Sequence, residues 1–480
     1  MGDESISYDI TALQQMTEYF DSCLEVAPVS ELTKRGVIFV EDGNHGQNRP
    51  RQDEFAQTGV AFLRPPDLKN GRVDFQNCGR INDAGFRRVR KGIGQRQDII
   101  LTHRATVGRI AMTDDEAPEV FVTNPGTTIW RSTNPRTLDQ RYLYCFMRSP
   151  AFMNQLWSQV GNNSTFDYVS LTQQRGLCVA FPLLPEQKAI AHVLGSLDDR
   201  IELNRRMNET LESMAQALFK SWFVDFDPVV DNALASGKEI PEELSEKAQA
   251  RAALGDKRRP LPEEIRTLFP DEFSHSDELG WIPLGWEVSS VGTEFDVTMG
   301  QSPPGTTYNA YGEGIAFFQG RADFGFRYPS KRIYCTAPKR LAKKGDTLVS
   351  VRAPVGDVNM AQMDCCIGRG VSAVLHKGES RSFTYYAMLE LREHFNKFEA
   401  EGTVFGSINQ KDFRALLHLK IDKKLIEAFD LHAGALDGKI EQNSMAILCL
   451  SKLRDTLLPK LLSGELRIPD AEKMVEELAL

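Results

Sequence analysis

The chain has 480 residues, of which 41% are hydrophobic and 26% charged, which is typical of a soluble globular protein with about two to four domains. No stretch approaches the roughly 18 apolar residues of a membrane span, and the acidic N-terminus does not resemble a signal peptide, so we expect a cytoplasmic protein. Eight scattered cysteines without a CxxC pair favour neither a zinc ribbon nor a disulfide framework.

The net charge of −9 is distributed unevenly along the chain. Residues 30–181 carry 20 basic and 15 acidic side chains, and residues 280–421 carry 17 and 14. The remaining segments are all acidic on balance. Because the location of charge matters more than its sum for binding nucleic acid, the two positive segments are candidate DNA-binding regions.

The first half of the chain predicts a globular domain that is followed by a long helix. After an acidic N-terminal segment at 1–21, residues 22–181 contain short apolar runs such as DIIL at 98–101, separated by Gly, Pro and Asn, which predict a β-rich domain. Within residues 182–226, apolar residues and two asparagines alternate at spacings of four and three residues from Ile190 to Trp222. This heptad pattern predicts a helix of roughly 35 residues, about 50 Å long.

The second half of the chain repeats this order. Residues 227–279 are rich in Asp, Glu and Pro and form an acidic connector, either a solvated linker or a docking surface for a partner. Residues 280–421 predict a second β-rich domain. A second heptad pattern predicts a helix over 422–468, and residues 469–480 form a tail.

Three sequence blocks occur in the same order in both halves, which indicates an internal repeat. The pairs are GVAFLR at 59–64 and GIAFFQ at 314–319, DIILTHRATVG at 98–108 and DTLVSVRAPVG at 346–356, and LDDRIELN at 197–204 and LDGKIEQN at 436–443. We therefore predict an α+β protein with a pseudo-twofold internal repeat, in which two β-rich domains are separated by two long helices.

Two matched long helices in one chain most simply pack on each other as an antiparallel coiled coil. The alternative is that each apolar stripe is one face of an ordinary core helix. Asn204 and Asn443 fall at equivalent positions, where a polar residue would fix the register at some cost in stability. The predicted interface consists of Leu194, Leu197, Ile201, Asn204, Leu211, Leu218, Leu436, Ile440, Asn443, Ile447, Leu450 and Leu457.

The sequence contains no recognised catalytic motif. It has no phosphate-binding loop, no HExxH and no GxSxG, and the SPPG string at 302–305 lacks the polar first residue and the aromatic last residue of an amino-methyltransferase motif. Asp98 and Asp346 recur in both halves, but no E-x-K follows them as in a metal nuclease, so we interpret both as turn carboxylates. We expect a chain without catalytic residues, metal or cofactor of its own.

Basic residues cluster at similar points in both positive segments. Arg and Lys contact phosphates and read base edges, although charged runs are often merely solvated surfaces. Because Arg104 and Arg352 are shared by the two halves, we expect them to contact phosphate or to have a structural role. The candidates in the first half are Arg49, Arg51, Arg80, Arg87, Arg88, Arg90, Lys91, Arg96 and Arg104. Those in the second half are Arg321, Arg327, Lys331, Arg332, Lys339, Arg340 and Arg352.

The helical segments resemble the specificity subunits of type I restriction–modification systems. The run FPLLPEQKAIAHVLGSLDDRIELNRRMNETLESMAQALFKSWFVDFDP at 181–228 is similar to their central helical region, and LGWIPLGWEV at 279–288 resembles the start of a recognition domain. The second helix keeps LDGKIEQN and LLPKLLSGEL but lacks the Pro-Glu-Gln start. The first domain has no counterpart of the Trp281–Trp286 run.

This resemblance implies a non-catalytic subunit of an adenine-methyltransferase and endonuclease complex. Target recognition domains at 22–181 and 280–421 would each read one half of a bipartite, asymmetric site in double-stranded DNA, and the helix pair would set the spacer. The implied partners are two methyltransferase (M) subunits, which would bind S-adenosylmethionine, and endonuclease/translocase (R) subunits. No membrane is implied.

Three other functions are compatible with the sequence. The chain could be a DNA-binding specificity or scaffold factor of a related defence system without the nuclease, which its partners would reveal. It could be an enzyme such as a nuclease with an unrecognised active site, which a metal-dependent cleavage assay would detect. A purely structural coiled-coil protein is the third, but the large β-rich segments argue against it.

Overall fold

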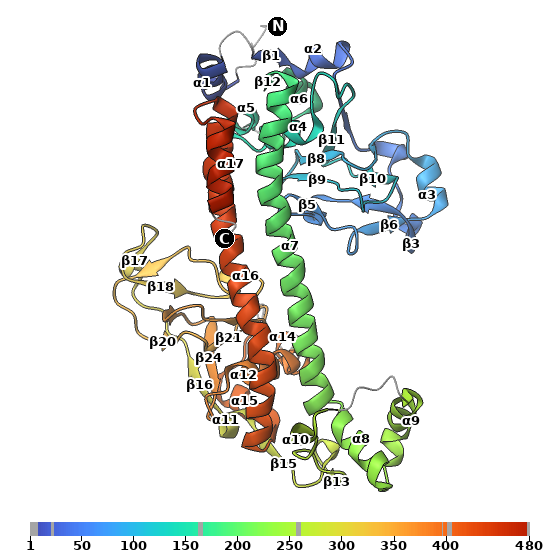
Figure 1. The fold of residues 1–480 in the computed structure, drawn as a ribbon, viewed down its shortest axis with the longest axis vertical. Coiled ribbons are helices and arrows are strands. Elements are labelled where there is room, and N and C mark those ends of the chain that lie inside the picture. The colour runs from blue at the N-terminus through green and yellow to red at the C-terminus, as the bar shows by residue number, and fades with distance from the viewer. Residues whose placement is uncertain are drawn as a thin grey trace. The chain divides into compact units, whose positions relative to one another are not determined.

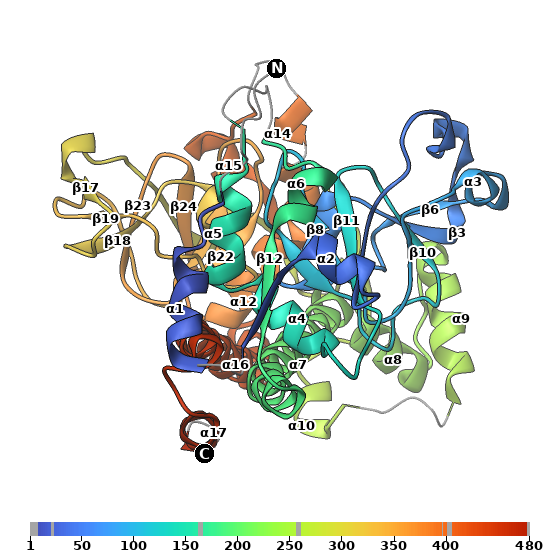
Figure 2. The same ribbon diagram turned by 90° about the horizontal axis from the view of Figure 1, so that it is seen from above.

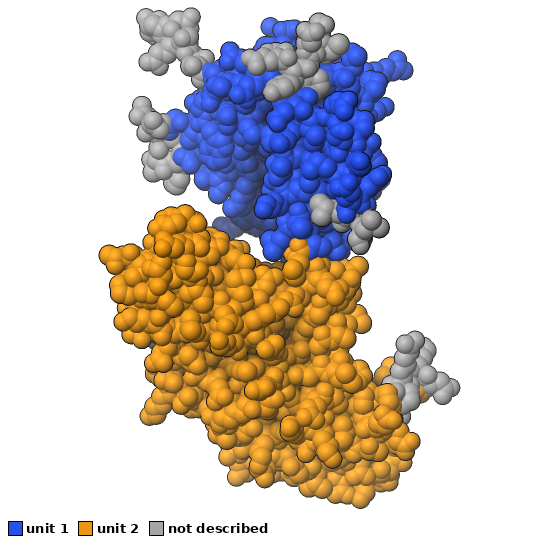
Figure 3. All heavy atoms as spheres, turned by 60° about the vertical axis from the view of Figure 1, so that its left-hand side comes forward, with its two compact units in different colours: residues 1–204, 446–480 blue, residues 205–445 orange. Residues whose placement is uncertain are grey.

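The computed structural model describes residues 8–20, 24–161, 167–255, 261–395, 397–400 and 406–477. The chain divides into two compact units, coloured separately in Figure 3. Unit 1 consists of residues 1–204 and 446–480, and unit 2 of residues 205–445. The long helices α7 (Leu184–Phe223) and α16 (Lys423–Ser463) each begin in one unit and end in the other.

The globular part of unit 1, from β1 to β12, contains two four-stranded sheets. The inner sheet has the order β2-β11-β8-β9 and is antiparallel. Its strands are β2 (Ile38–Asp42), β8 (Ile99–Thr102), β9 (Ile110–Met112) and β11 (Thr127–Ser132). The outer sheet has the order β6-β3-β10-β7, with strands β3 (Phe55–Leu63), β6 (Gly79–Ile81), β7 (Ile93–Gly94) and β10 (Phe121–Thr123).

Strand β8 is buried on both faces because the inner sheet lies between two apolar layers. Ile99 and Leu101 belong to the core shared with the helices, whereas Ile100 packs with Phe121 of the outer sheet. This division follows from the alternation of side chains along a strand. Figure 2 shows β3, β6 and α3 (Asp83–Arg88) farther from α4 (Gln140–Met147) and α5 (Pro150–Ser158) than β8 and β11 are.

Shorter elements complete the globular part of unit 1. Helices α4 and α5 cover the inner sheet, where Trp130 packs edge-on against Phe152 with ring centroids 5.5 Å apart. Asp139 caps α4 by accepting a hydrogen bond from the backbone N–H of Tyr142 at 2.9 Å. The remaining elements are α1 (Thr11–Phe20), β1 (Glu25–Pro28), α2 (Val29–Lys34), β4 (Leu68–Lys69), β5 (Arg72–Val73), α6 (Leu171–Gly176) and β12 (Cys178–Phe181).

The globular part of unit 2, from β15 to β25, has the same two-sheet arrangement. Its antiparallel inner sheet has the order β16-β24-β21-β22, and its outer sheet the order β17-β19-β18-β23-β20. In both units one outer strand runs parallel to its neighbour, β3 with β10 and β18 with β23. The strands are β15 (Glu287–Ser290), β16 (Phe295–Met299), β17 (Tyr308–Asn309), β18 (Ile315–Phe318), β19 (Tyr334–Cys335), β20 (Leu341–Ala342), β21 (Thr347–Ser350), β22 (Val358–Met360), β23 (Cys365–Ile367), β24 (Val371–His376) and β25 (Leu417–Lys420).

Matching strand orders confirm the predicted internal repeat and the α+β class. The helices of the second globular part are α11 (Val291–Glu294), α12 (Arg381–Glu390), α13 (Arg392–Phe395), α14 (Lys397–Ala400) and α15 (Gln410–Ala415). Between α7 and this part lie α8 (Asp227–Ser236), α9 (Ser245–Ala253), α10 (Glu263–Arg266), β13 (Phe273–Ser276) and β14 (Gly280–Pro283). The last described helix of the chain is α17 (Ile468–Glu477).

The predicted antiparallel pairing of α7 and α16 is confirmed in each unit (Figure 1). In unit 1, Leu194 and Leu197 share a core with Leu457 near the C-terminal end of α16. In unit 2, the C-terminal part of α7, with Phe219, packs against Phe429 near the start of α16 at a centroid distance of 5.6 Å. Residues early in one helix therefore meet residues late in the other.

Two buried asparagines form a polar contact between the two helices in unit 2, but one prediction needs correction. Asn443 donates a hydrogen bond from Nδ2 to Oδ1 of Asn208 at 3.0 Å, and Asn208 donates to Oγ of Ser444 at 3.2 Å. Asn204, the predicted counterpart of Asn443, is half-buried instead. The repeat aligns Asn204 with Asn443 in sequence, but antiparallel packing brings a residue one helical turn farther along α7 opposite Asn443.

The other predicted interface residues vary in burial. Six side chains are at most 8% exposed, and four are half-buried. The buried ones are Leu194, Leu197, Ile201, Ile440, Leu450 and Leu457. The half-buried ones are Leu211, Leu218, Leu436 and Ile447, which, like Asn204, lie toward the edges of the helix contact.

A cluster of buried charges connects the globular part of unit 2 to both long helices. The Arg327 side chain is 1% exposed and donates to Oε2 of Glu212 on α7 at 3.3 Å and to Oδ1 of Asp437 on α16 at 3.0 Å. It also donates to the Tyr386 hydroxyl at 2.8 Å and lies 3.9 Å from the ring centre of Tyr385. A DNA contact by Arg327, predicted from its basic neighbours, is therefore wrong for this arrangement, because its donors are directed to buried acids.

A related cluster is present in unit 1. Asp198 on α7 accepts hydrogen bonds from Arg148 at 2.6 Å and from Arg454 on α16 at 2.7 Å. Arg148 lies 4.8 Å from the ring centre of Tyr144, and burial raises the pKa of that tyrosine to about 12. Asp198 and Asp437 occupy the same position of the LDxxIExN repeat. One acid with two arginines in unit 1 thus corresponds to one arginine with two acids in unit 2.

Replacing Asn443 should destabilise the helix pair. Asn443→Ala leaves Oδ1 of the buried Asn208 without its donor, so we expect the free energy of unfolding to fall by about 1–3 kcal/mol. Urea denaturation of the full chain measures this, with exposed Gln442→Ala as the control. Replacing both asparagines by leucine should restore stability, since no polar group is then stranded. Equal effects of Asn443→Ala and Gln442→Ala would contradict the structural role of this contact.

Removing the Arg327 guanidinium should be costlier. Arg327→Met leaves Glu212 and Asp437 buried without a cation, which should lower the free energy of unfolding by about 3–5 kcal/mol. Arg327→Lys should rescue little, because a lysine cannot reproduce the planar fork that reaches both acids and the Tyr385 ring. The matched control is Lys331→Met, on an exposed side chain nearby in sequence. Denaturation curves that coincide for Arg327→Met and Lys331→Met would rule out an anchoring role for the cluster.

Candidate nucleic-acid interface

The repeated aspartates are turn carboxylates, as predicted. Asp98 accepts the backbone N–H of Gln95 at 2.8 Å, and Asp346 accepts that of Lys343 at the same distance. Asp98 also receives both arms of Arg131 at 2.6 Å. Burial raises the pKa of both aspartates. Within the described part of the chain, no group of three or more His, Cys, Asp or Glu side chains could hold a metal ion.

Four of the basic candidates in the first globular part are held by internal partners. Arg88 binds Oε1 of the buried Glu54 at 2.5 Å, and this hydrogen bond holds the pKa of Glu54 below its usual value. Lys91 pairs with Asp42. Arg80 donates to the carbonyls of Gly59 and Phe75, and Arg96 to that of Ala117 at 2.8 Å. These internal contacts therefore fix the four side chains in position, and all four remain partly accessible.

The other five candidates of this part have exposed side chains. A buried asparagine connects two of the segments that carry them. Asn44, 2% exposed, accepts the backbone N–H of Arg90 at 2.8 Å and that of Lys91 at 3.2 Å through Oδ1. This contact ties the loop that carries Arg49 and Arg51 to the segment that follows α3. The exposed side chains are Arg49, Arg51, Arg87, Arg90 and Arg104. The structure thus brings together two basic segments that are about 40 residues apart in sequence.

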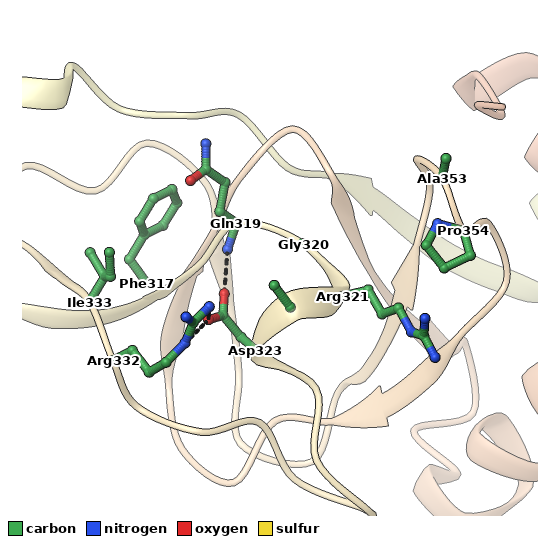
Figure 4. A pocket seen from close by; sticks show the side chains of 10 residues that line it. Phe317, Gln319, Gly320, Arg321, Asp323, Arg332, Ile333, Ala353 and Pro354 are labelled. Atoms are coloured by element: carbon green, nitrogen blue, oxygen red, sulfur yellow. Dashed lines mark hydrogen bonds and ion pairs between the residues drawn. The ribbon is translucent and has the colours of Figure 1, made fainter. Parts of the chain in front are cut away.

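In the second globular part, six of the seven candidates are exposed, and Arg327 is the buried exception described above. Arg332 forks onto Oδ1 of Asp323 at 2.9 and 2.5 Å, and Arg321 pairs with Asp357. Lys331, Lys339, Arg340 and Arg352 have exposed side chains. Arg321 and Arg332 line a cavity of about 540 Å³ next to the C-terminal end of β18 (Figure 4).

Arg104 and Arg352 occupy equivalent exposed turns. Each forms an isolated antiparallel bridge with a distant segment, Arg104 with Tyr168 and Arg352 with Ser407. Glycine follows four residues later in both, and Gly108 and Gly356 have φ angles of 94° and 89°, which side chains other than glycine rarely adopt. The backbone of the turn is thus fixed by the repeat, while the arginine side chain is presented to solvent.

Sequence reasoning overlooked the buried anchors that hold the basic surfaces in place. Asp198, Asp437 and Tyr385 bind the arginines of the two buried ion clusters. Asn44 holds the loop that carries Arg49 and Arg51. The identity of Asp198 and Asp437 within the helical repeat was the available signal for the first two. Tyr144 and Tyr385 lie at matching positions of α4 and α12, but the surrounding sequences differ too much to reveal the match.

Comparison with known proteins finds similarity over most of the chain. Residues 41–213 match the family model described as the type I restriction modification DNA specificity domain. The MjaX specificity subunit of Methanocaldococcus jannaschii is 26% identical, with 85% of this chain and 88% of that protein covered. The type I restriction enzyme HindI specificity subunit of Haemophilus influenzae is 25% identical over 88% of this chain and 98% of its own length.

A solved structure supports the fold. The crystal structure of the type I restriction-modification system S subunit from M. genitalium matches with a TM-score of 0.50 and 14% sequence identity, covering 91% of this chain and 96% of that one. Among the described residues, no helix combines the length and apolar character needed to cross a membrane. The resemblance drawn from the sequence is thereby confirmed: residues 41–213 match the DNA specificity domain, and most of the chain is similar to specificity subunits of type I restriction–modification systems.

Proposed function

We propose that this chain reads a bipartite, asymmetric DNA site for a type I restriction–modification complex. The observation that carries the proposal is the repeat itself. The two globular parts share the strand order of the inner sheet and, apart from the additional strand β17, that of the outer sheet, but their exposed side chains differ. Two related but non-identical readers suit two different half-sites. Each recognition domain would then contact one half of the target, with exposed arginines on the phosphates.

The helix pair would set the spacer between the half-sites. Helix α7 has 40 residues and α16 has 41, which corresponds to about 60 Å each at 1.5 Å per residue. Two recognition domains that approach the same face of B-DNA require half-site centres that are one helical turn, about 10 bp, apart. A pair of helices locked by an Asn–Asn contact can hold such a separation, because buried polar contacts fix the register of helices.

Partner subunits would supply the chemistry. We infer that two methyltransferase subunits dock on the long helices and methylate adenine with S-adenosylmethionine, and that endonuclease/translocase subunits complete the complex, while this chain contributes no catalytic group. Large apolar side chains that are exposed on both helices support docking there. They are Leu203 and Met214 on α7, which are 61% and 54% exposed, and Leu431, Met445 and Leu448 on α16, which are 75%, 58% and 62% exposed.

The proposal is tested by mapping methylated adenines in the native cell with and without the gene. We expect this chain to co-purify with a methyltransferase and its deletion to remove one gapped methylation motif. An unchanged pattern of methylated adenines, together with purification free of any methyltransferase, would contradict the proposed function. Cleavage of DNA by the isolated chain in the presence of a divalent metal would contradict the non-catalytic assignment.

The exposed arginines Arg87 and Arg90 of the first globular part provide a second test. Arg87→Ala combined with Arg90→Ala removes two exposed cations, so fewer counterions are released when the assembled complex binds its site. We expect weaker binding and a slope of log K against log salt that is shallower by about 2. Lys34→Ala combined with Arg136→Ala removes the same charge from other exposed positions and serves as the control. If both pairs give the wild-type slope, these two arginines do not contact phosphates.

A further inference from the structure

Both globular parts place one exposed polar residue directly after equivalent strands. Strand β3 ends at Leu63 and is followed by Arg64, and β18 ends at Phe318 and is followed by Gln319. The two residues close the aligned blocks GVAFLR and GIAFFQ. Each strand runs parallel to its outer-sheet neighbour, so the two positions lie at the same end of the same sheet in the two repeats.

A buried carboxylate fixes the backbone at both positions. Oδ2 of Asp67 accepts the backbone N–H of Arg64 at 2.7 Å, and Oδ2 of Asp323 accepts that of Gln319 at 3.2 Å. The aspartates are 7% and 5% exposed. Both side chains stay exposed. Nε of Arg64 lies 3.9 Å from Oδ2 of Asp67, and Figure 4 shows the Gln319 amide directed away from the Asp323–Arg332 ion pair. A fixed backbone with an accessible side chain is the arrangement that a reading residue requires.

Backbone hydrogen bonds connect each position to the shared arginine turn. In unit 1, Asn124 donates to the Leu63 carbonyl at 2.9 Å, and His103, which precedes Arg104, donates to that of Gly126 at 3.0 Å. Two backbone hydrogen bonds therefore connect the end of β3, next to Arg64, through the β10–β11 connection to the turn that carries Arg104.

Equivalent residues of unit 2 make the same two backbone hydrogen bonds. Gly368 donates to the Phe318 carbonyl at 2.9 Å, and Val351, which precedes Arg352, donates to that of Gly370 at 3.0 Å. Gln319 and Ala353, the neighbour of Arg352, line the same cavity of about 540 Å³. In unit 2, Gln319 thus lies beside the turn that carries Arg352, and the matching hydrogen bonds support the same arrangement of Arg64 and Arg104 in unit 1.

The chemistry of the two positions separates their duties. Arg104 and Arg352 are identical in two readers, so they suit the phosphate, which is common to every half-site. Arg64 and Gln319 differ at a matched place, so they suit what differs between half-sites, the base pair. An arginine makes two hydrogen bonds to O6 and N7 of guanine, and a glutamine makes two to N6 and N7 of adenine.

We propose that Arg64 and Gln319 are specificity-determining residues that read a guanine in one half-site and an adenine in the other, with Arg104 and Arg352 on phosphates nearby. The inference rests on the proposed function, because it needs two readers and a bipartite target. Base readout is then assigned to one position of the repeat. Exchanging the side chains at that position should exchange the bases that the two domains read.

The experiment exchanges the two side chains in the native complex and maps methylated adenines across the genome. With Gln319→Arg we expect one A·T pair of one half-site to become G·C, while the other half-site stays as in the wild type. Arg64→Gln should make the reciprocal change in the other half-site. Gln319→Ala should relax that position, so that discrimination among bases falls by about 10- to 100-fold.

Controls separate this inference from the proposed function. Gln15→Arg and Arg136→Gln make the same chemical exchanges at exposed positions outside the outer sheets and the long helices, and should leave the motif unchanged. A wild-type complex without any gapped motif would overturn the proposed function. A gapped wild-type motif that stays the same at every position in Gln319→Arg, Gln319→Ala and Arg64→Gln would overturn the inference alone. Loss of all methylation in an assembled Gln319→Ala complex would also overturn it, because loss of a reading contact relaxes a position instead of abolishing recognition.

Discussion

The ion clusters around Asp198 and Asp437 decide where each globular part sits on the long helices. A buried ion pair costs desolvation that its own attraction barely offsets, so such clusters add more to orientation than to stability. Here each cluster joins three elements at once, including both long helices. Everything that faces outward on a globular part, including its basic edge, is oriented by this contact.

The two clusters have opposite charge balance, although each globular part contributes one arginine to its cluster. In unit 1, Arg148 binds Asp198 of α7, which also binds Arg454 of α16. In unit 2, Arg327 binds Glu212 of α7 and Asp437 of α16. The difference therefore lies in the helix segments, which supply one acid and one arginine in unit 1 and two acids in unit 2.

Local patterns in the sequence predicted the architecture but not the partners of individual charges. The repeat blocks, the heptads and the apolar runs predicted the sheets and both long helices, since alternation and heptad spacing depend on near neighbours. The burial of Arg327 depends on Glu212 and Asp437, which are 115 and 110 residues away. Arg88 likewise meets Glu54 only through the fold. For the same reason the repeat suggested Asn204, while packing selected Asn208.

Unit 1 is assembled from both ends of the chain, whereas unit 2 is one continuous stretch. Leu457, Leu461 and Ala471 belong to the same core as Leu194 and Trp130. During synthesis, the first globular part must therefore wait with part of its apolar surface uncovered until the last helices leave the ribosome. Unit 2 can close as soon as its own residues have emerged. The order of completion thus runs against the order of translation, and a chain cut short after residue 445 keeps a complete second unit beside an unfinished first one.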